Sequence, residues 1–261
     1  MLLAPRIVEG APGNLGDPLG WRALHQQHSQ RIAGARKLFA RDPSQALTVL
    51  VYGASIMESW TGQSFGYPLE DAAQLKTAYD NHFSAVRSEV FGISGDCTEQ
   101  LLWRLQNGEA PEGIGARLVI CNIGTNDITE LLLRDLAKQD ELASLILGAC
   151  QLLLQADSQL HVVLIGILPR ASDWDSWGRL APHWPNRVSA AIERVNWRLQ
   201  QYCEGTDRAS YCDCTPCFVC MQAEGQLRRD LYRDDLMHPN AAGMDCIGSS
   251  LKPYILQIAR S

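Results

Sequence analysis

Ser55 is the first residue of this chain whose position indicates chemistry. It directly follows a short apolar run, Leu47–Tyr52, and precedes Ile56–Trp60, which has the character of a helical turn. A hydroxyl group at the N-terminus of a helix lies in a field that favours developing negative charge. A serine that caps the helix fits the same position, and Glu58, three residues later, fits a capping box. Ser55 is therefore either a nucleophile or a helix cap. The nucleophile additionally requires a base and oxyanion donors elsewhere in the chain.

Asp235 and His238 provide a candidate base for such a serine. They lie three residues apart, so a helical turn would place both on one face. The carboxylate can then orient the imidazole through one ring nitrogen while the other faces a nucleophile. The alternative is a surface sequence ahead of a helix that begins near Pro239. The remaining histidines lack a comparable carboxylate after a strand end: His25, His28, His82, His161 and His183.

Gly95 and Asn126 are candidate donors for the oxyanion that a serine nucleophile creates. Glycine offers its backbone N–H without side-chain obstruction, asparagine offers a side-chain amide, and the Ser55 N–H would be a third donor. Each residue alone is equally compatible with a structural role, Gly95 in a tight turn and Asn126 in a turn or cap. Their common location at one edge of a predicted sheet favours the catalytic interpretation.

That sheet is predicted from five short apolar runs, which are too short for helices and rich in β-branched residues. The predicted strands are 47–52, 85–91, 117–123, 161–167 and 209–212. The predicted helices are 21–39, 99–106, 129–155, 189–203 and 240–258. Such alternation predicts one α/β domain with a five-stranded parallel sheet and helices on both faces. Ligands bind beyond the carboxyl ends of such strands, where Ser55, Gly95 and Asn126 lie.

Composition excludes several other classes of function. The chain has 261 residues, 23 Lys and Arg against 29 Asp and Glu, and no strongly basic block, so we expect no nucleic-acid binding. No run reaches 18 apolar residues, and the N-terminal sequence does not resemble a secretory signal, so we expect no transmembrane segment. Nine cysteines, an odd number, fit free thiols in a reducing compartment, which predicts a cytoplasmic protein.

Four of those cysteines form the run C-D-C-T-P-C-F-V-C at 212–220. A metal site and a disulfide are the alternatives to reduced thiols. Zinc sites usually show paired C-x-x-C units with a longer separation, and a strand through this region would point alternate side chains apart. We therefore expect no metal and no cofactor.

Four segments together resemble the blocks of the SGNH (GDSL-type) hydrolases. They are GASI (53–56), GISGD (92–96), GTND (124–127) and DLMHPNAAG (235–243), in the family's order. Within that superfamily, FGISGDCTEQLLWRLQNGE (91–109) and GILPR (166–170) look most like the catalytic subunits of platelet-activating factor acetylhydrolase. The resemblance implies a flavodoxin-like fold for a domain at 45–261. The Pro- and Gly-rich start and the helical spacing that follows predict that residues 1–44 form a lead-in and a helix packed on that domain.

The resemblance also implies a Ser55–His238–Asp235 triad and an oxyanion hole of Ser55, Gly95 and Asn126. The expected function is hydrolysis of a small-acyl or acetyl ester through an acyl-enzyme, with a small-molecule ester as partner and a homodimer as one arrangement of the family. One departure is Ala54, where the family usually has Asp. It leaves a catalytically weak or silent ligand-binding protein as an alternative. An acyltransferase or a lysophospholipase of the same fold also remains open.

Three tryptophans are candidate substrate contacts. Trp60 closely follows the nucleophile, and Trp174 and Trp177 lie in a segment after the fourth strand, where they could form a wall over the site. Packing of these rings against the body of the protein explains them equally well.

Overall fold

The computed structural model describes residues 20–172, 180–220 and 225–259. Its main sheet has five parallel strands in the order β4-β1-β5-β6-β7, the flavodoxin-like order, which confirms the predicted fold class. The strands are β1 (Val49–Gly53), β4 (Ser88–Gly92), β5 (Leu118–Asn122), β6 (His161–Ile165) and β7 (Ala209–Cys212). Every residue of β1 and of β5 is buried, as expected for strands covered on both faces.

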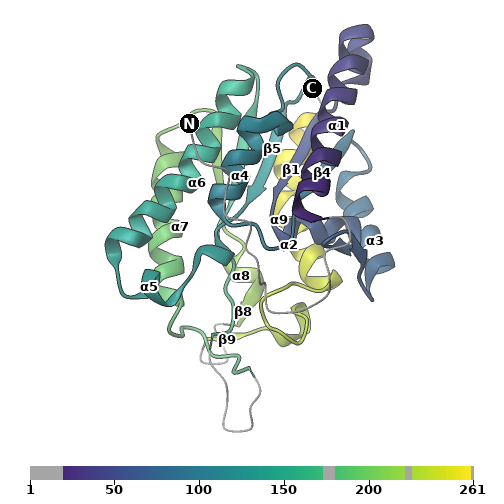
Figure 1. Cartoon of the computed structure of the whole chain (residues 1–261). Coiled ribbons are helices and arrows are strands. Elements are labelled where there is room, and N and C mark those ends of the chain that lie inside the picture. Colours follow the sequence, from purple (N-terminus) through teal and green to yellow (C-terminus); the bar gives the residue numbers. More distant parts are fainter. Residues whose placement is uncertain (1–19, 173–179, 221–224, 260–261) are drawn as a thin grey trace.

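Helices cover both faces of this sheet (Figure 1). On one face α3 packs against α9, and on the other α6 packs against both α4 and α7. The long helices are α1 (Gly20–Arg41), α3 (Ala72–Phe83), α6 (Leu136–Ala156), α7 (Ser189–Glu204) and α9 (Ala241–Ala259). The short ones are α2 (Ser55–Glu58), α4 (Thr98–Arg104), α5 (Glu130–Leu133) and α8 (Thr215–Phe218). One hydrophobic core extends through the described part of the chain, from Ile32 of α1 to Ile255 of α9.

The register of the sheet aligns the strand ends that carry the candidate site. Gly53 at the end of β1 pairs with Gly92 of β4 on one side and with Asn122 of β5 on the other. Gly92 also allows α2 to cross the sheet edge closely, because a Cβ there would lie 2.4 Å from the backbone nitrogen of Glu58. The loops that follow these three strands therefore meet at one edge.

The helices differ from the prediction at two places. The stretch expected as one helix over 129–155 is two helices, because Asp135 caps a new one by accepting hydrogen bonds from the Ala137 and Lys138 amides. Helix α3 was not anticipated. It buries only Leu75, Ala78 and Phe83.

Two small antiparallel pairs were not predicted either. They are β2 (Gln63–Ser64) with β3 (Tyr67–Pro68), and β8 (Val219–Cys220) with β9 (Gln226–Leu227). Both have two-residue strands, too short to show an alternating pattern.

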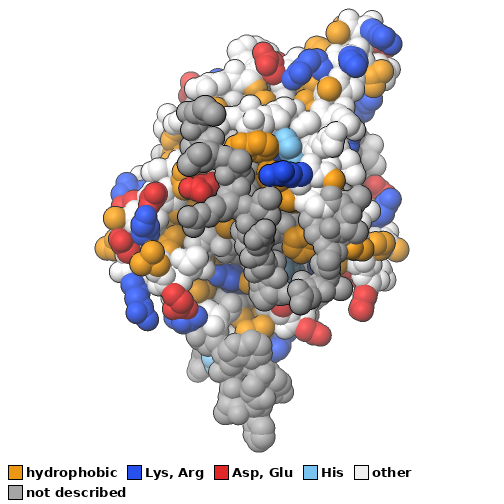
Figure 2. All heavy atoms as spheres, in the orientation of Figure 1, with side chains coloured by type: hydrophobic (Ala, Val, Ile, Leu, Met, Phe, Trp, Pro, Cys, Tyr) orange, Lys and Arg blue, Asp and Glu red, His pale blue; other side chains and the backbone are white. Residues whose placement is uncertain are grey.

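Helix α1 lies across the strand β4 side of the molecule, and its C-terminal half extends beyond the body (Figure 1). Its buried residues, Leu24, His28 and Ile32, all belong to the first two thirds of the helix. Lys and Arg side chains gather at the projecting end, whereas acidic and basic groups are mixed elsewhere on the visible face (Figure 2). Among the described residues, none of the helices has the length and apolar character needed to cross a bilayer.

Candidate active site

Ser55, His238 and Asp235 form a continuous chain of hydrogen bonds. The Ser55 Oγ lies 2.8 Å from the His238 Nε2, although the two residues are 183 positions apart. The His238 Nδ1 lies 2.6 Å from the Asp235 Oδ2. Ser55 is 7% exposed, so the imidazole contacts a hydroxyl that is largely shielded from water. This arrangement can move a proton from the hydroxyl to the imidazole.

The local structure at Ser55 differs from that of a capping serine. Ser55 is the first residue of α2, Ala54 holds the N-cap position, and no side chain caps this helix. The Ser55 hydroxyl contacts His238 instead. Ala54, where the family usually has Asp, is buried and 4% exposed. The Ser55–His238 contact therefore forms without a carboxylate at that position.

A tight turn positions Asp235 and His238. The Asp235 Oδ1 accepts hydrogen bonds from the Met237 and His238 amides, at 2.9 and 2.8 Å, and Leu236 between them adopts a φ of +46°. Burial would raise the pKa of Asp235, but the hydrogen bonds from His238 and from the Met237 amide outweigh it and lower the pKa to about 2. Asp235 therefore stays ionised and can support positive charge on the imidazole at neutral pH.

The two further oxyanion-hole candidates lie on loops that follow β4 and β5. Gly95 has a φ of +82°, a backbone conformation that residues with a side chain rarely adopt. The Asn126 Nδ2 donates a hydrogen bond of 2.8 Å to the carbonyl oxygen of Asp96. This bond fixes the amide and uses one of its two N–H groups, so one remains to donate to a ligand.

Glu58 has a role that the capping-box interpretation missed. Its carboxylate does not cap α2 but accepts hydrogen bonds from the Ser94 amide and hydroxyl, at 2.7 and 2.5 Å, and from the Gly66 amide at 2.9 Å. Glu58 is only 4% exposed. A buried anion in the helix that carries Ser55 therefore fixes both the loop before Gly95 and the β2–β3 hairpin.

A buried ion cluster lies behind the Gly95 loop. The Arg104 side chain is fully buried, with its Nε 2.8 Å from the Asp96 Oδ2 and its Nη1 2.5 Å from the Glu109 Oε2. It also donates to the carbonyl oxygens of Gly53 and Phe91, at the ends of β1 and β4. Arg104 thus connects the strand ends beneath the site to the loop that carries Gly95.

Helix α1 closes this cluster from outside. The His25 Nδ1 lies 2.8 Å from the Glu109 Oε1, and the His28 Nδ1 lies 3.4 Å from the Oε2. Burial lowers the pKa of His28, although Glu109 opposes that shift. Burial raises the pKa of Asp96 to about 6, against the opposing effects of Arg104 and of the Trp21 indole.

Of the three candidate substrate contacts, only Trp60 lies within the described residues. Trp60 is 1% exposed, and its ring packs against Tyr79 and Phe83, with centroids 5.6 and 5.7 Å away. Trp60 is a core residue, and this corrects the interpretation that it contacts substrate. Trp174 and Trp177 lie outside the described residues.

The cysteine run does not assemble a metal centre among the described residues, and all nine cysteines are free thiols. Strand β7 ends at Cys212, so Cys214 turns back and places its Sγ 3.9 Å from the Cys212 Sγ. Burial raises the pKa of Cys121 and of Cys246 to about 12, so these thiols stay protonated.

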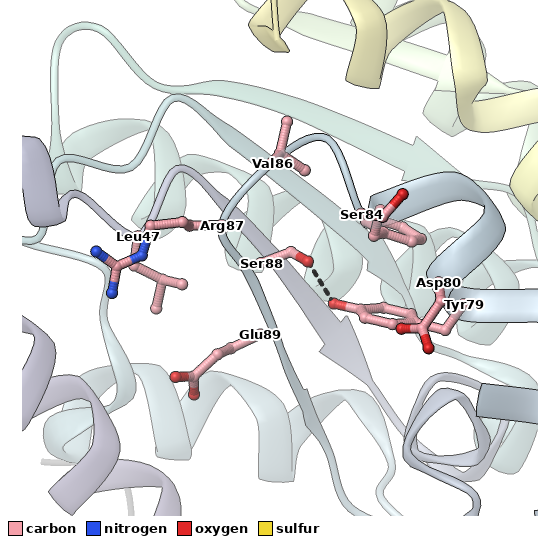
Figure 3. Close-up of a pocket in the computed structure, with 9 residues that line it drawn as sticks. Leu47, Tyr79, Asp80, Ser84, Val86, Arg87, Ser88 and Glu89 are labelled. Carbon is pink, nitrogen blue, oxygen red and sulfur yellow. Dashed lines mark hydrogen bonds between the residues drawn. The ribbon is translucent and has the colours of Figure 1, made fainter. Parts of the chain in front are cut away.

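A separate cavity of about 340 Å³ lies at the opposite, amino end of the sheet. Figure 3 shows its wall, including the start of β4 and the Tyr79 hydroxyl that donates to Ser88 Oγ at 2.7 Å. It contains none of the candidate catalytic residues, so the chemistry must be sought at the carboxyl edge.

Comparison with known proteins identifies the family of this chain. Residues 51–246 match the model of the GDSL-like Lipase/Acylhydrolase family. Platelet-activating factor acetylhydrolase IB subunit alpha2 of Rattus norvegicus is 34% identical over 177 residues, 67% of each chain. Subunit alpha1 of Bos taurus is 29% identical over 67% of this chain and 66% of its own length. The chain thus spans about two thirds of these relatives.

Similar solved structures include a GDSL-like lipase from Bacteroides thetaiotaomicron. It has a TM-score of 0.58 and 20% identity, and the match covers 88% of this chain and 97% of that chain. At this identity the likeness concerns the fold. The family match covers most of the sequence, and the chain therefore belongs to the GDSL-like lipase/acylhydrolase family, which confirms the resemblance found in the four sequence blocks.

Proposed function

We propose that this GDSL-like acylhydrolase is a serine esterase that cleaves a small-acyl or acetyl ester through a covalent acyl-enzyme. The observation that carries the proposal is the hydrogen-bonded chain from Asp235 through His238 to Ser55 at the carboxyl edge of the sheet. A serine, a base and an orienting carboxylate in this order are the parts that nucleophilic acyl transfer requires.

In the proposed mechanism the His238 Nε2 takes the proton of the Ser55 hydroxyl as its oxygen attacks the ester carbonyl. Asp235 holds the imidazole through Nδ1 and stabilises the imidazolium. The oxyanion is bound by the N–H groups of Ser55 and Gly95 and by the free N–H of Asn126. His238 then gives its proton to the leaving alcohol. Water next attacks the acyl-enzyme as His238 takes its proton, and His238 returns that proton to the Ser55 Oγ as the acid leaves.

The names of the relatives support the small acyl group. Two relatives that align with two thirds of this chain are described as acetylhydrolases. We infer from them that a short acyl chain, with acetyl as the first choice, is the substrate class. No metal or organic cofactor takes part in the steps proposed.

The alternative, a silent ligand-binding protein, is motivated by Ala54. An Asp at that position would add a charged hydrogen-bonding group beside the nucleophile. The Ser55–His238 distance of 2.8 Å supports the esterase, because the base and the hydroxyl meet without that group.

A fluorophosphonate probe separates these two functions. We expect covalent modification at Ser55 and hydrolysis of 4-nitrophenyl acetate by the wild-type protein. Ser55→Ala should lose both while it melts at the wild-type temperature. Ser144→Ala is the matched control, since this exposed serine on α6 only donates to the Asp140 carbonyl. An unlabelled wild-type protein, or wild-type hydrolysis by Ser55→Ala, would refute the esterase.

A further inference from the structure

The tip of the β2–β3 hairpin carries an aromatic residue in an unfavourable conformation. Phe65 and Gly66 form its two-residue turn, with φ values of +52° and +77°. Turns of this type normally use Asn, Asp or Gly, because a bulky side chain disfavours positive φ. Phe65 is 37% exposed, so burial in the core does not explain its presence. Backbone strain at such a position indicates a function for the side chain.

The Phe65 ring contacts Gly95. A Cβ built on Gly95 would lie 3.5 Å from the Phe65 Cε1 and 3.6 Å from Cζ. Among the described residues, apart from those adjoining Gly95, no other residue comes within 4 Å of it. The ring edge therefore lies at van der Waals distance from the open side of Gly95. It borders the loop that offers the Gly95 N–H to the proposed oxyanion.

Polar contacts hold the hairpin tip against this loop. The Glu58 carboxylate accepts from Gly66 at the tip and from Ser94, the residue before Gly95. The hydroxyls of Ser64 and Ser94 add a hydrogen bond of 2.9 Å. Because the buried Glu58 belongs to the helix that carries Ser55, these bonds tie the backbone of the hairpin tip to that helix.

We propose that Phe65 is a specificity-determining residue that limits the acyl group of the ester to short chains. The inference rests on the proposed esterase function. In that reaction the leaving oxygen must face the His238 Nε2, and the oxyanion must face the Gly95 N–H. The acyl substituent takes the remaining in-plane direction from the carbonyl carbon, away from His238. We infer that the aromatic ring beside Gly95 restricts a long acyl chain that leaves the carbonyl carbon on that side.

The test varies the acyl chain and the alcohol separately. Phe65→Asn removes the ring and suits the left-handed turn. Its kcat/KM ratio for 4-nitrophenyl octanoate over 4-nitrophenyl acetate should rise at least about tenfold above that of the wild type, as expected when a steric restriction of a methylene or more is relieved. Phe65→Tyr keeps the ring and should keep the wild-type ratio. Acetate esters of different alcohols should retain their wild-type order in Phe65→Asn.

Tyr67→Ala is the matched control, because Tyr67 is an equally exposed aromatic residue of the same hairpin that does not approach Gly95. It should leave the octanoate-to-acetate ratio unchanged. An unchanged ratio in Phe65→Asn, or a change in alcohol preference alone, overturns the role of Phe65 while the esterase function stands. A wild-type protein that hydrolyses none of these esters refutes the esterase function itself.

Discussion

The indole Nε1 of Trp21 donates a hydrogen bond of 2.6 Å to the Oδ1 of Asp96, across 75 positions of sequence. The carbonyl oxygen of Asp96 in turn accepts the Asn126 Nδ2, a donor of the proposed oxyanion hole. One residue therefore lies between the first turn of helix α1 and the candidate site. Removing the indole donor should lower the stability of the protein, because it leaves a buried carboxylate oxygen of Asp96 with one hydrogen-bond partner fewer.

Trp21→Phe tests this connection. The phenyl ring can keep aromatic contacts with His25 and Trp103 but cannot donate to Asp96. We expect the free energy of unfolding to fall by about 1–3 kcal/mol, measured by urea denaturation. Trp197→Phe, at a site 52% exposed on α7, should change it by less than about 0.5 kcal/mol. Equal effects of the two substitutions would contradict a special role for Trp21.

Asn126→Ala should remove one donor of the oxyanion hole. We expect kcat for acetate esters to fall by roughly 10²–10³, with a much smaller change in KM, because the lost bond acts mainly in the transition state. Asn81→Ala, on the surface of α3, should retain wild-type kinetics. A folded Asn126→Ala protein with kcat within a few-fold of wild type would exclude this donor.

Asp235→Asn should remove the negative charge beside His238 while keeping the turn that positions it. The Asn oxygen can still accept the Met237 and His238 amides, while its NH₂ group would face the His238 Nδ1 and favour the wrong tautomer. We expect kcat to fall by about 10⁴ with the melting temperature nearly retained. Asp234→Asn is the neighbouring exposed control and should stay active. Retained kcat in Asp235→Asn would show that the carboxylate is dispensable.

Glu109 should contribute to acid sensitivity. Burial would raise its pKa, but Arg104 and the two histidines of α1 outweigh burial and lower the pKa to about 2, below the ordinary value of 4.5. Since the unfolded chain binds the proton more readily, this contribution to stability is present above pH 4.5 and is lost as the pH falls towards 2.

Urea denaturation between pH 3 and pH 6 measures this contribution. The wild type should lose more stability across that interval than Glu109→Gln, which has no carboxyl group to protonate there. Glu109→Gln should also be less stable at pH 6, because Arg104 loses a charged partner inside the protein. Parallel pH profiles for the two proteins would contradict the lowered pKa.

The sheet and the candidate site were largely predictable, because the signals that indicate them lie in short stretches of sequence. Strands such as Val49–Gly53 are buried on both faces, so their apolar runs are visible without knowledge of the rest of the chain. The rule that ligands lie beyond the strand ends then selected Ser55, Gly95 and Asn126. Two of the misjudged features depend on tertiary contacts. Trp60 faces the core because of the rotation of a short helical turn, and Glu58 accepts hydrogen bonds from loops rather than from its own helix.

The buried ion cluster could not be inferred in the same way. Arg104 and Glu109 are charged residues on a short helix and the turn that follows it, and such residues usually face water. Their burial depends on α1, more than 60 positions earlier, covering them. The turn Phe65-Gly66 likewise lacks the Asn-Gly or Asp-Gly sequence that announces a hairpin.

The position of α1 bears on how the chain can be shortened. The catalytic candidates all lie beyond Leu47, so a fragment that begins there would hold every recognisable motif. It would also expose Arg104 and Glu109 to solvent on the side that His25 and His28 now cover. We expect such a fragment to be expressed poorly or to bind ester substrates in a distorted pocket. We therefore expect the smallest useful unit for recombinant work to include Gly20–Arg41 together with the segments that carry the motifs.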